Sequence, residues 1–217
     1  MVYDLKKIKS LQICQMTHEM LKEVSRIHIH AFKGAMNTRL GELYVRKFFD
    51  WFIHIENGIA LVAILKNGAR EEIVGYAIGV PPGLGKSIDR DLFWIVCWSV
   101  CLRPWLILSR QFQMTIMARL KAILNPFPTQ NLLPINLPDP VMSLVGLAVE
   151  PGHQGQNIGE ELLCIFEDRA RGFHSRSLKL SVYPENCAAR RVYEKCGWIP
   201  CEVAEESPKA MFYYKIL

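Results

Sequence analysis

The stretch VEPGHQGQNIGEELL, from Val149 to Leu163, joins two segments of different character. An extended apolar run precedes it, and a pattern with helical spacing follows it. The residues between them, HQGQNIG, are glycines and polar residues with few large apolar side chains. This order predicts a strand, a turn with little side-chain bulk, and the start of a helix.

A helix that starts in such a turn is suited to binding an anion. Its first amide groups have no acceptor within the helix, and the helix dipole adds partial positive charge there. Gly155 and Gly159 would let a phosphate approach the main chain. The chain has no GxxxxGK[ST] and no GxGxxG near an N-terminal strand, so the nucleotide folds that carry those loops are disfavoured.

The composition is that of one folded domain. Half of the 217 residues are hydrophobic and 22% are charged, which allows a sizeable core and argues against disorder. The net charge of +5 suits an anionic ligand. Lys and Arg are spread along the chain without interleaved aromatic residues, so we expect no nucleic-acid partner. We expect a single domain over residues 1–217 with an insertion at about 82–140.

The cysteines and the first residues predict a cytoplasmic protein. The start, MVYDLKKIKS, has no apolar signal segment behind its lysines, and no CxxC occurs. We therefore expect free, buried thiols in a reducing compartment. The seven cysteines are Cys14, Cys97, Cys101, Cys164, Cys187, Cys196 and Cys201.

Hydrophobic periodicity predicts the elements on either side of the insertion. Before it we expect a strand at 10–17, a helix from 19 to 34, a helix from about 40 to 58, and a hairpin of strands 58–68 and 71–80 that turns at Asn67-Gly68. After it we expect a strand at 141–150, a helix at 158–172, a strand at 177–183, a helix at 186–196, and strands at 198–203 and 211–217. The helical crossovers predict a parallel strand pair within a mixed sheet.

The insertion, Pro81 to Pro140, is apolar between proline-rich ends. Its most apolar run, 92–108, contains one charge, Arg103, and is interrupted by Pro104, so we expect two helices. The second helix is predicted to be amphipathic, with an apolar face formed by Trp105, Leu108, Phe112, Ile116, Leu120 and Ile123. The apolar run is shorter than the about 20 residues that span a bilayer. Packing within the protein is favoured, and attachment to a membrane surface is the alternative.

A second stretch, SVYPENCAARRVYEKCGW, runs from Ser181 to Trp198. It predicts a strand that ends at Tyr183, a turn, and a helix capped by Asn186 and closed by Gly197. Tyr193 falls in the last turn of that helix, where its hydroxyl can reach the mouth between the strands.

Together the two stretches resemble the GNAT superfamily of acyl-CoA-dependent N-acyltransferases. The first resembles the family's [QR]-x-x-G-x-[GA] turn, with Gln154 and Gly159 in place and Asn157 at the middle glycine. Asparagine tolerates left-handed backbone better than most residues, so the loop is expected to keep its shape. The second stretch matches N-x-x-A-x-x-x-Y-x-K-x-G-[FW] through Asn186, Ala189, Tyr193, Lys195, Gly197 and Trp198.

The resemblance implies an α/β (α+β) fold: a mixed, mostly antiparallel sheet with a splayed parallel pair in the middle and helices on both faces. It also implies that acetyl-CoA binds where strands 144–149 and 178–182 diverge. The pantetheine arm would pair with the main chain of Leu147 and Val149, and the pyrophosphate would accept from the turn amides. The implied cofactor-binding residues are Leu147, Ala148, Val149, Gln154, Gly155, Gln156, Asn157, Gly159, Glu160, Asn186 and Ala189.

The implied reaction is direct attack of an amine on the thioester. Tyr193 would protonate the departing thiolate, and the amide of Leu147 would stabilise the oxyanion. The residue that takes the proton from the amine is not evident from the sequence, and Glu42, Glu150 and His153 are only weak candidates. His153 is expected to face solvent. No metal is expected: His28 and His30 lie two apart on a helix and so point to different faces.

The resemblance leaves the acceptor open. We expect a primary amine of a small molecule or an amino sugar, with the insertion walling its pocket and a homodimer contact left open. The alternatives are a non-catalytic acyl-CoA-binding module of the same fold and a membrane-associated acyltransferase that uses helices in 92–124.

Overall fold

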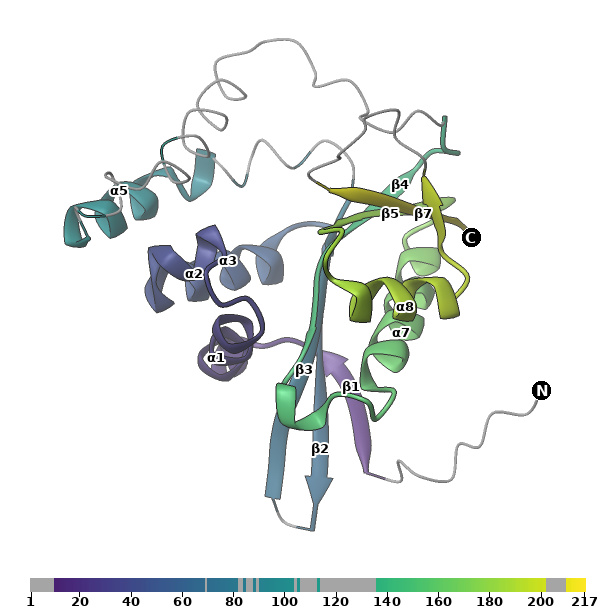
Figure 1. Ribbon diagram of the computed structural model, residues 1–217, viewed down its shortest axis with the longest axis horizontal. Helices are drawn as coiled ribbons and strands as arrows, with labels where there is room; N and C mark the ends of the chain where they lie inside the picture. The colour runs from purple at the N-terminus through teal and green to yellow at the C-terminus, as the bar shows by residue number, and fades with distance from the viewer. Residues whose placement is uncertain are drawn as a thin grey trace.

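Seven strands form one sheet in the order β1-β2-β3-β4-β5-β7-β6 (Figure 1). The computed structural model describes residues 10–68, 70–81, 84, 88, 90–103, 105, 113, 136–201 and 210–217. Every pair of neighbouring strands is antiparallel except β4 and β5, which are parallel. The predicted mixed sheet with a central parallel pair is confirmed. The strands are β1 (Leu11–Gln15), β2 (Ile59–Asn67), β3 (Arg70–Val80), β4 (Val141–Val149), β5 (Ser177–Val182), β6 (Ile199–Cys201) and β7 (Met211–Ile216).

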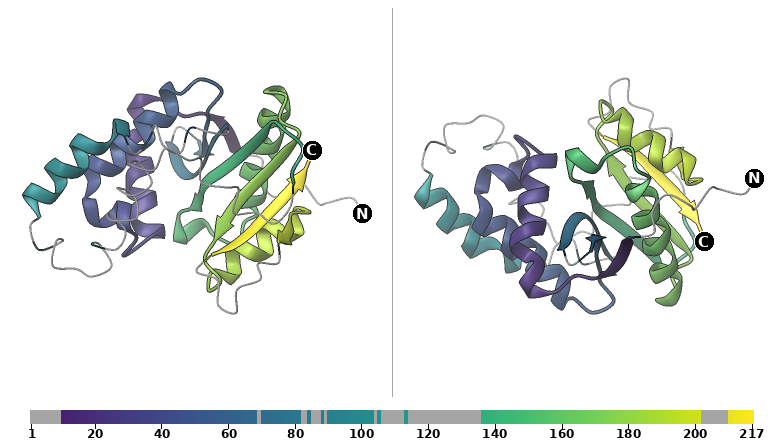
Figure 2. Two further views of the ribbon diagram at one scale, coloured as in Figure 1. Left: turned by 90° about the horizontal axis from the view of Figure 1, so that it is seen from above. Right: turned by 90° about the horizontal axis from the view of Figure 1, so that it is seen from below.

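Helices cover both faces of the sheet (Figure 1), as predicted. One side carries α1 (Leu21–Ala31), α2 (Met36–Leu40) and α3 (Glu42–His54), with α5 (Phe93–Leu102) packed on α2 and α3. The other side carries α7 (Ile158–Gly172) and α8 (Cys187–Lys195). Figure 2 shows the purple and blue helices and the green helices on opposite sides of the strands. Two short 3-10 turns, η2 (His18–Met20) and η4 (Pro151–His153), precede α1 and α7.

The core is divided by the sheet into two clusters of buried side chains. Along β2, Ala60, Val62 and Ile64 face the side of α1 and α3, while Ile59, Leu61 and Ala63 face the side of α7. This is the period of two that a strand buried on both faces requires.

The helix predicted from about 40 to 58 corresponds to α3, which begins at Glu42 and ends at His54, and the short helix α2 precedes it. Gly41, with φ of 97°, separates α2 from α3, and such a conformation favours glycine. A Cβ atom at Gly41 would also lie 2.5 Å from the Arg103 guanidinium, which would have to move aside. The break lets α2 and α3 take different directions over the sheet.

The first part of the insertion is tied to α2 and α3. Trp51 Nε1 donates to Asp91 Oδ2 at 3.0 Å, and Arg103 Nη1 donates to the carbonyl of Leu40 at 2.9 Å. α5 ends at Leu102, just before Arg103, as predicted. The predicted second helix lies outside the described residues. No helix within the described ranges is both long enough and apolar enough to cross a membrane.

The cysteines are free, as predicted, but most are not buried. Only Cys201 is buried, whereas Cys101, Cys164 and Cys187 are exposed because they lie on the solvent sides of α5, α7 and α8. The prediction of buried thiols was wrong for these three.

Candidate functional site

The parallel strands β4 and β5 part after three residue pairs. Val141, Met142 and Ser143 pair with residues 177–179, and no later residue of β4 pairs with β5. A bulge in β4 accompanies the divergence: Leu144 and Gly146 pair with consecutive residues of β3, which leaves Val145 as the extra residue. A bulge bends its strand, and here the bend lies where β4 turns away from β5.

The diverging stretch of β4 has an open main-chain edge. The amide of Glu150 donates to the carbonyl of Val74 on β3 at 2.8 Å. In an antiparallel ladder the inward and outward groups alternate, so the amides and carbonyls of Leu147 and Val149 face away from β3, toward the gap. The side-chain amide of Gln154 already donates to the carbonyl of Val149 at 3.0 Å. The main-chain groups of both residues therefore lie along the gap between β4 and β5.

The glycine turn follows at the end of β4. Gly155 and Asn157 are left-handed, with φ of 77° and 62°, so the asparagine takes the conformation expected of it. Among the described hydrogen bonds, no main-chain carbonyl accepts from the amides of residues 155–159. A Cβ at Gly155 would meet nothing within 4 Å. The turn therefore presents amide donors and open space at the start of a 15-residue helix, an arrangement suited to an anion.

Helix α8 lies beside α7 and is capped as predicted. The side chain of Asn186 accepts from the amide of Ala189 at 3.2 Å. Lys195 Nζ bridges to both carboxylate oxygens of Glu160, each at 2.7 Å. Glu160, predicted as a cofactor-binding residue, thus joins the two helices that flank the turn.

Tyr193 points from α8 into the core near the strand ends. Its side chain is buried and packs against the rings of Trp198 and Tyr213. Burial, with a contribution from Tyr213, raises the pKa of Tyr193 to about 12. Burial also raises the pKa of Tyr76 on β3 well above its usual range, and proximity to Tyr193 adds to this increase. Both hydroxyls therefore keep their protons at neutral pH.

A large cavity of about 840 Å³ lies between α1, α2, α3 and the open stretch of β4. It reaches Val145 and Gly146 at the bulge and Tyr183 beyond the end of β5. Its wall includes Leu84 and Ile88, which belong to the insertion. The remaining wall is mostly apolar and aromatic, with contributions from Phe32, Met36, Phe48, Trp51, Phe52, Tyr76, Ile78 and Val80.

His28 is a polar group in this wall. Its Nδ1 lies 2.7 Å from the hydroxyl of Tyr76, and its ring packs beside Phe32 and Phe49. Nε2 of His28 is buried and has no hydrogen-bond partner among the described residues. Burial lowers the pKa of His28 to about 4, so the ring is neutral at pH 7.

None of the three proton acceptors considered from the sequence lines the cavity. Neither Glu42, which is exposed at the start of α3, nor Glu150, which is 3.1 Å from His30 Nδ1, lines the cavity. His153 was expected to face solvent, but it is half-buried, with a buried and unpartnered Nδ1 within the described part of the chain. Its place in η4, folded against the end of β4, explains the difference.

Sequence reasoning missed the pairing of His28 with Tyr76. His28 was considered only as a partner of His30, and the two rings do point to different contacts: Tyr76 for the first and Glu150 for the second. The available signal was the position of His28, four residues after the buried Val24 and one after Ile27, on the apolar face of α1.

Comparisons with known proteins agree with this geometry. Residues 116–198 match the model of the acetyltransferase (GNAT) family. That match contains β4, the glycine turn, α7, β5 and α8. A comparison with curated protein sequences gives no match.

Solved structures share the fold over nearly the whole chain. One is yncA, a proposed acetyltransferase from Salmonella typhimurium with its cofactor acetyl-CoA, at 14% identity and a TM-score of 0.57, covering 96% of this chain and 95% of that one. Another is the ribosomal-protein-alanine N-acetyltransferase from Brucella melitensis, at 16% identity and a TM-score of 0.55, covering 95% of this chain and 99% of that one. A third is an N-acetyltransferase from Staphylococcus aureus Mu50, at 12% identity and a TM-score of 0.56, covering 96% of this chain and 99% of that one.

Proposed function

From its GNAT acetyltransferase domain, we propose that this protein transfers the acetyl group of acetyl-CoA to a primary amine of a small molecule. One observation carries the proposal. The cavity walled by α1, α2 and α3 meets the open edge of β4 at Val145 and Gly146. A cofactor bound along that edge and an acceptor bound in the cavity would therefore meet at the bulge.

The residues present fit acetyl-CoA. The outward main-chain groups of Leu147 and Val149 can pair with the amide-rich pantetheine arm, as an added strand would. The amides of residues 155–159, which no described carbonyl binds, can donate hydrogen bonds to the pyrophosphate, and Asn157 holds the left-handed conformation of the turn. The other cofactor contacts that we propose are Ala148, Gln154, Gln156, Glu160, Asn186 and Ala189.

The wall of the cavity indicates the kind of acceptor. No Asp or Glu is present among the described residues that line it, whereas Lys33 and Arg39 are. The rest of the wall offers few hydrogen-bonding groups, and an amino sugar with several hydroxyls would leave many of them unpaired. We therefore favour an amine with a largely apolar body and an anionic group near the two cations.

The chain supplies groups for both proton transfers. Acetyl-CoA supplies an activated acyl group, and the acceptor must lose a proton as its amine attacks. His28 is neutral at pH 7, and in the tautomer whose Nδ1–H donates to the Tyr76 hydroxyl it would accept that proton at Nε2. Tyr193, protonated at neutral pH, would donate to the departing thiolate, and the outward amide of Leu147 would donate to the oxyanion.

Two other functions keep specific support. A protein or peptide amine is an alternative acceptor, because one structural neighbour is a ribosomal-protein-alanine N-acetyltransferase. A membrane-associated acyltransferase is the other alternative, because Trp94 and Trp98 on α5 are 79% and 58% exposed. A non-catalytic acyl-CoA-binding module of the same fold also remains an alternative, and only an activity assay distinguishes it from an enzyme.

The test is release of free CoA from acetyl-CoA against a panel of apolar amines, amino sugars and N-terminal peptides. We expect turnover with at least one apolar amine and a fall in kcat of about 10²–10⁴-fold in His28→Gln. His30→Gln, two residues along the same helix, serves as the control and should retain activity. Tight CoA binding without turnover on the panel would favour the binding module, and peptide turnover alone would move the acceptor to proteins.

A further inference from the structure

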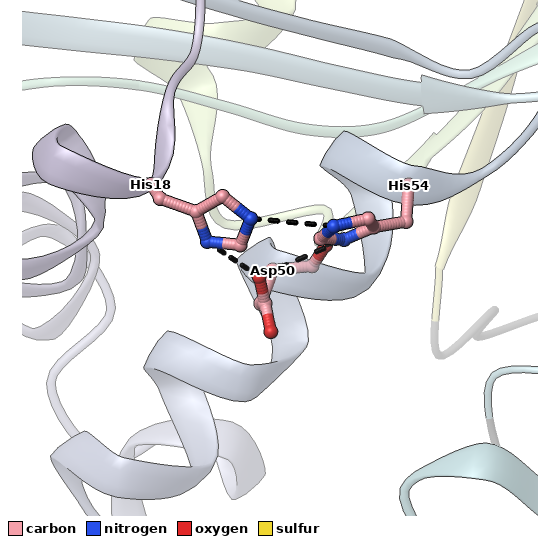
Figure 3. Close-up of side chains that lie close together, drawn as sticks. All are labelled: His18, Asp50 and His54. Carbon is pink, nitrogen blue, oxygen red and sulfur yellow. Dashed lines mark hydrogen bonds and ion pairs between the residues drawn. The ribbon is translucent and has the colours of Figure 1, made fainter.

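Three side chains converge on the surface where η2 meets α3, away from the cavity. His18 lies in η2, and Asp50 and His54 lie one turn apart near the end of α3 (Figure 3). None of the three lines the cavity. Both histidine side chains are more than half exposed, whereas the Asp50 side chain is 20% exposed.

Asp50 lies beside Nδ1 of both rings. Nδ1 of His54 lies 2.8 Å from the main-chain carbonyl of Asp50, and a carbonyl can only accept. Nδ1 of His18 lies 2.9 Å from Oδ1 of Asp50 as an ion-pair contact, and Oδ1 accepts no hydrogen bond from the described residues. In the neutral tautomers that carry both protons on Nδ1, on the side of Asp50, both Nε2 atoms have a lone pair.

The two Nε2 atoms face one another at 3.2 Å (Figure 3). In the tautomers with both protons on Nδ1, the two lone pairs at this distance repel unless a cation lies between them. With Zn–N bonds of about 2.0–2.1 Å and tetrahedral angles, two nitrogens bound to one zinc lie about 3.4 Å apart. The observed separation is close to that value.

We propose that His18 and His54 bind a divalent transition-metal ion through their Nε2 atoms, with Asp50 orienting both rings. The imidazole pair selects zinc, nickel or copper over calcium and magnesium, which prefer oxygen ligands. Asp50 contributes negative charge beside the ion, and its second oxygen is 3.4 Å from Lys47 Nζ. Water would complete the coordination, since the rings are exposed.

The sequence gives no motif for this site, because its ligands are 36 residues apart. His54 and Asp50 have the i, i+4 spacing of one helix face, but the third group comes from η2. The site is independent of the proposed acetyl transfer, and each can fail without the other.

A proton is the competing occupant, since His18 as an imidazolium would donate to His54 and to Asp50 in the same geometry. Zinc binding to the full chain separates the two cases. The protein should carry no histidine tag, and its accessible thiols should first be blocked with N-ethylmaleimide, because three cysteines are exposed. Calorimetry with Zn²⁺ alone then counts the remaining sites.

We expect the wild-type protein to bind one more zinc ion than either His18→Ala or His54→Ala. His174→Asn, which changes a histidine at the end of α7 and suits the left-handed conformation there, should bind as the wild type does. Asp50→Asn should weaken the affinity by about 10–100-fold, as expected for a residue that orients metal ligands. Equal zinc stoichiometry in the wild type and in His54→Ala would overturn the proposal.

Thermal unfolding gives a second readout. Zinc should raise the Tm of the wild type and leave the Tm of His18→Ala and His54→Ala unchanged, because the ion would join η2 to α3 only when both ligands are present. The metal-free Tm of each variant checks that it is folded. A zinc-dependent rise of equal size in all three proteins would also overturn the site.

Discussion

The imidazole of His28 and the hydroxyl of Tyr76 are joined by a 2.7 Å hydrogen bond between α1 and β3. This contact sits in the wall of the large cavity, and both groups are buried. The stability of the fold therefore depends on whether the His28 ring is protonated.

That stability should fall in acid. Burial lowers the pKa of His28 from 6.5 to about 4, so between these values the unfolded chain binds a proton that the folded protein does not. The contribution is complete above pH 6.5 and is lost progressively as the pH falls toward 4, by at most about 3 kcal/mol. Urea unfolding from pH 7.5 to 4 should show a shallower decline in His28→Gln than in the wild type. Parallel declines would mean that His28 does not stay neutral in the folded protein.

The glycine turn should lose its cofactor when a carboxylate enters it. A Cβ at Gly159 meets only Val149 Cγ2, at 3.8 Å, so Gly159→Glu can fold. The new charge would occupy the start of α7, where a phosphate would otherwise bind, and should weaken acetyl-CoA binding at least about tenfold, or 1.4 kcal/mol. Gly172→Glu, at the far end of the same helix and with open space around it, is the matched control. Calorimetry measures the acetyl-CoA affinity of both variants, and equal affinities would mean that the phosphates bind at another place.

Tyr193 should matter for the rate of reaction more than for cofactor binding. Its pKa of about 12 keeps the hydroxyl protonated, which a general acid requires. Tyr193→Phe should lower kcat by about 10²–10⁴-fold with little change in acetyl-CoA affinity. The ring contacts with Trp198 and Tyr213 persist in the variant, so its Tm should change little. A kcat within about threefold of the wild type, well below the usual range for such groups, would make the residue structural.

The ion pair between Glu167, which is buried on α7, and Lys215 should contribute strongly to stability. Glu167 is 5% exposed and accepts from Trp198 Nε1 at 2.8 Å and from Lys215 Nζ at 2.6 Å. Glu167→Leu would leave both donors without this partner and should cost about 3 kcal/mol.

Asp168→Leu provides the comparison for Glu167→Leu, since Asp168 is the next residue and its side chain is 61% exposed in its pair with Arg171. An exposed pair of this kind contributes less than about 1 kcal/mol. Urea midpoints that coincide for the two variants would show that the buried carboxylate adds no stability of its own.

The parts of the molecule that the sequence predicted correctly are those with local signals. Asn157 takes the left-handed turn, Asn186 caps α8, and Gly197 with φ of 80° closes it, because each depends on a few neighbouring residues. The period-two pattern of β2 likewise follows from its own side chains. The helix α2, Met36–Leu40, was not predicted, because its five residues are too few to show a helical period.

The features that the sequence did not predict depend on contacts between segments that are far apart along the chain. His28 and Tyr76 are 48 residues apart and meet only because α1 packs on β3. The bulge at Val145 depends on the register against β3, which leaves no mark in the composition of β4. The cavity is formed by three helices, two strands and the start of the insertion, so its polar groups could be identified only from the structure.

The open edge of β4 gives a central strand an unusual pattern of amide protection. Gly146 and Ala148 direct their amides toward β3, whereas Leu147 and Val149 direct theirs into the gap. Hydrogen exchange should therefore alternate along a strand in the middle of the sheet, slow at the first two residues and fast at the second two. A ligand that pairs with this edge would slow exchange at Leu147 and Val149 and leave their neighbours unchanged, so two amides alone would report its presence.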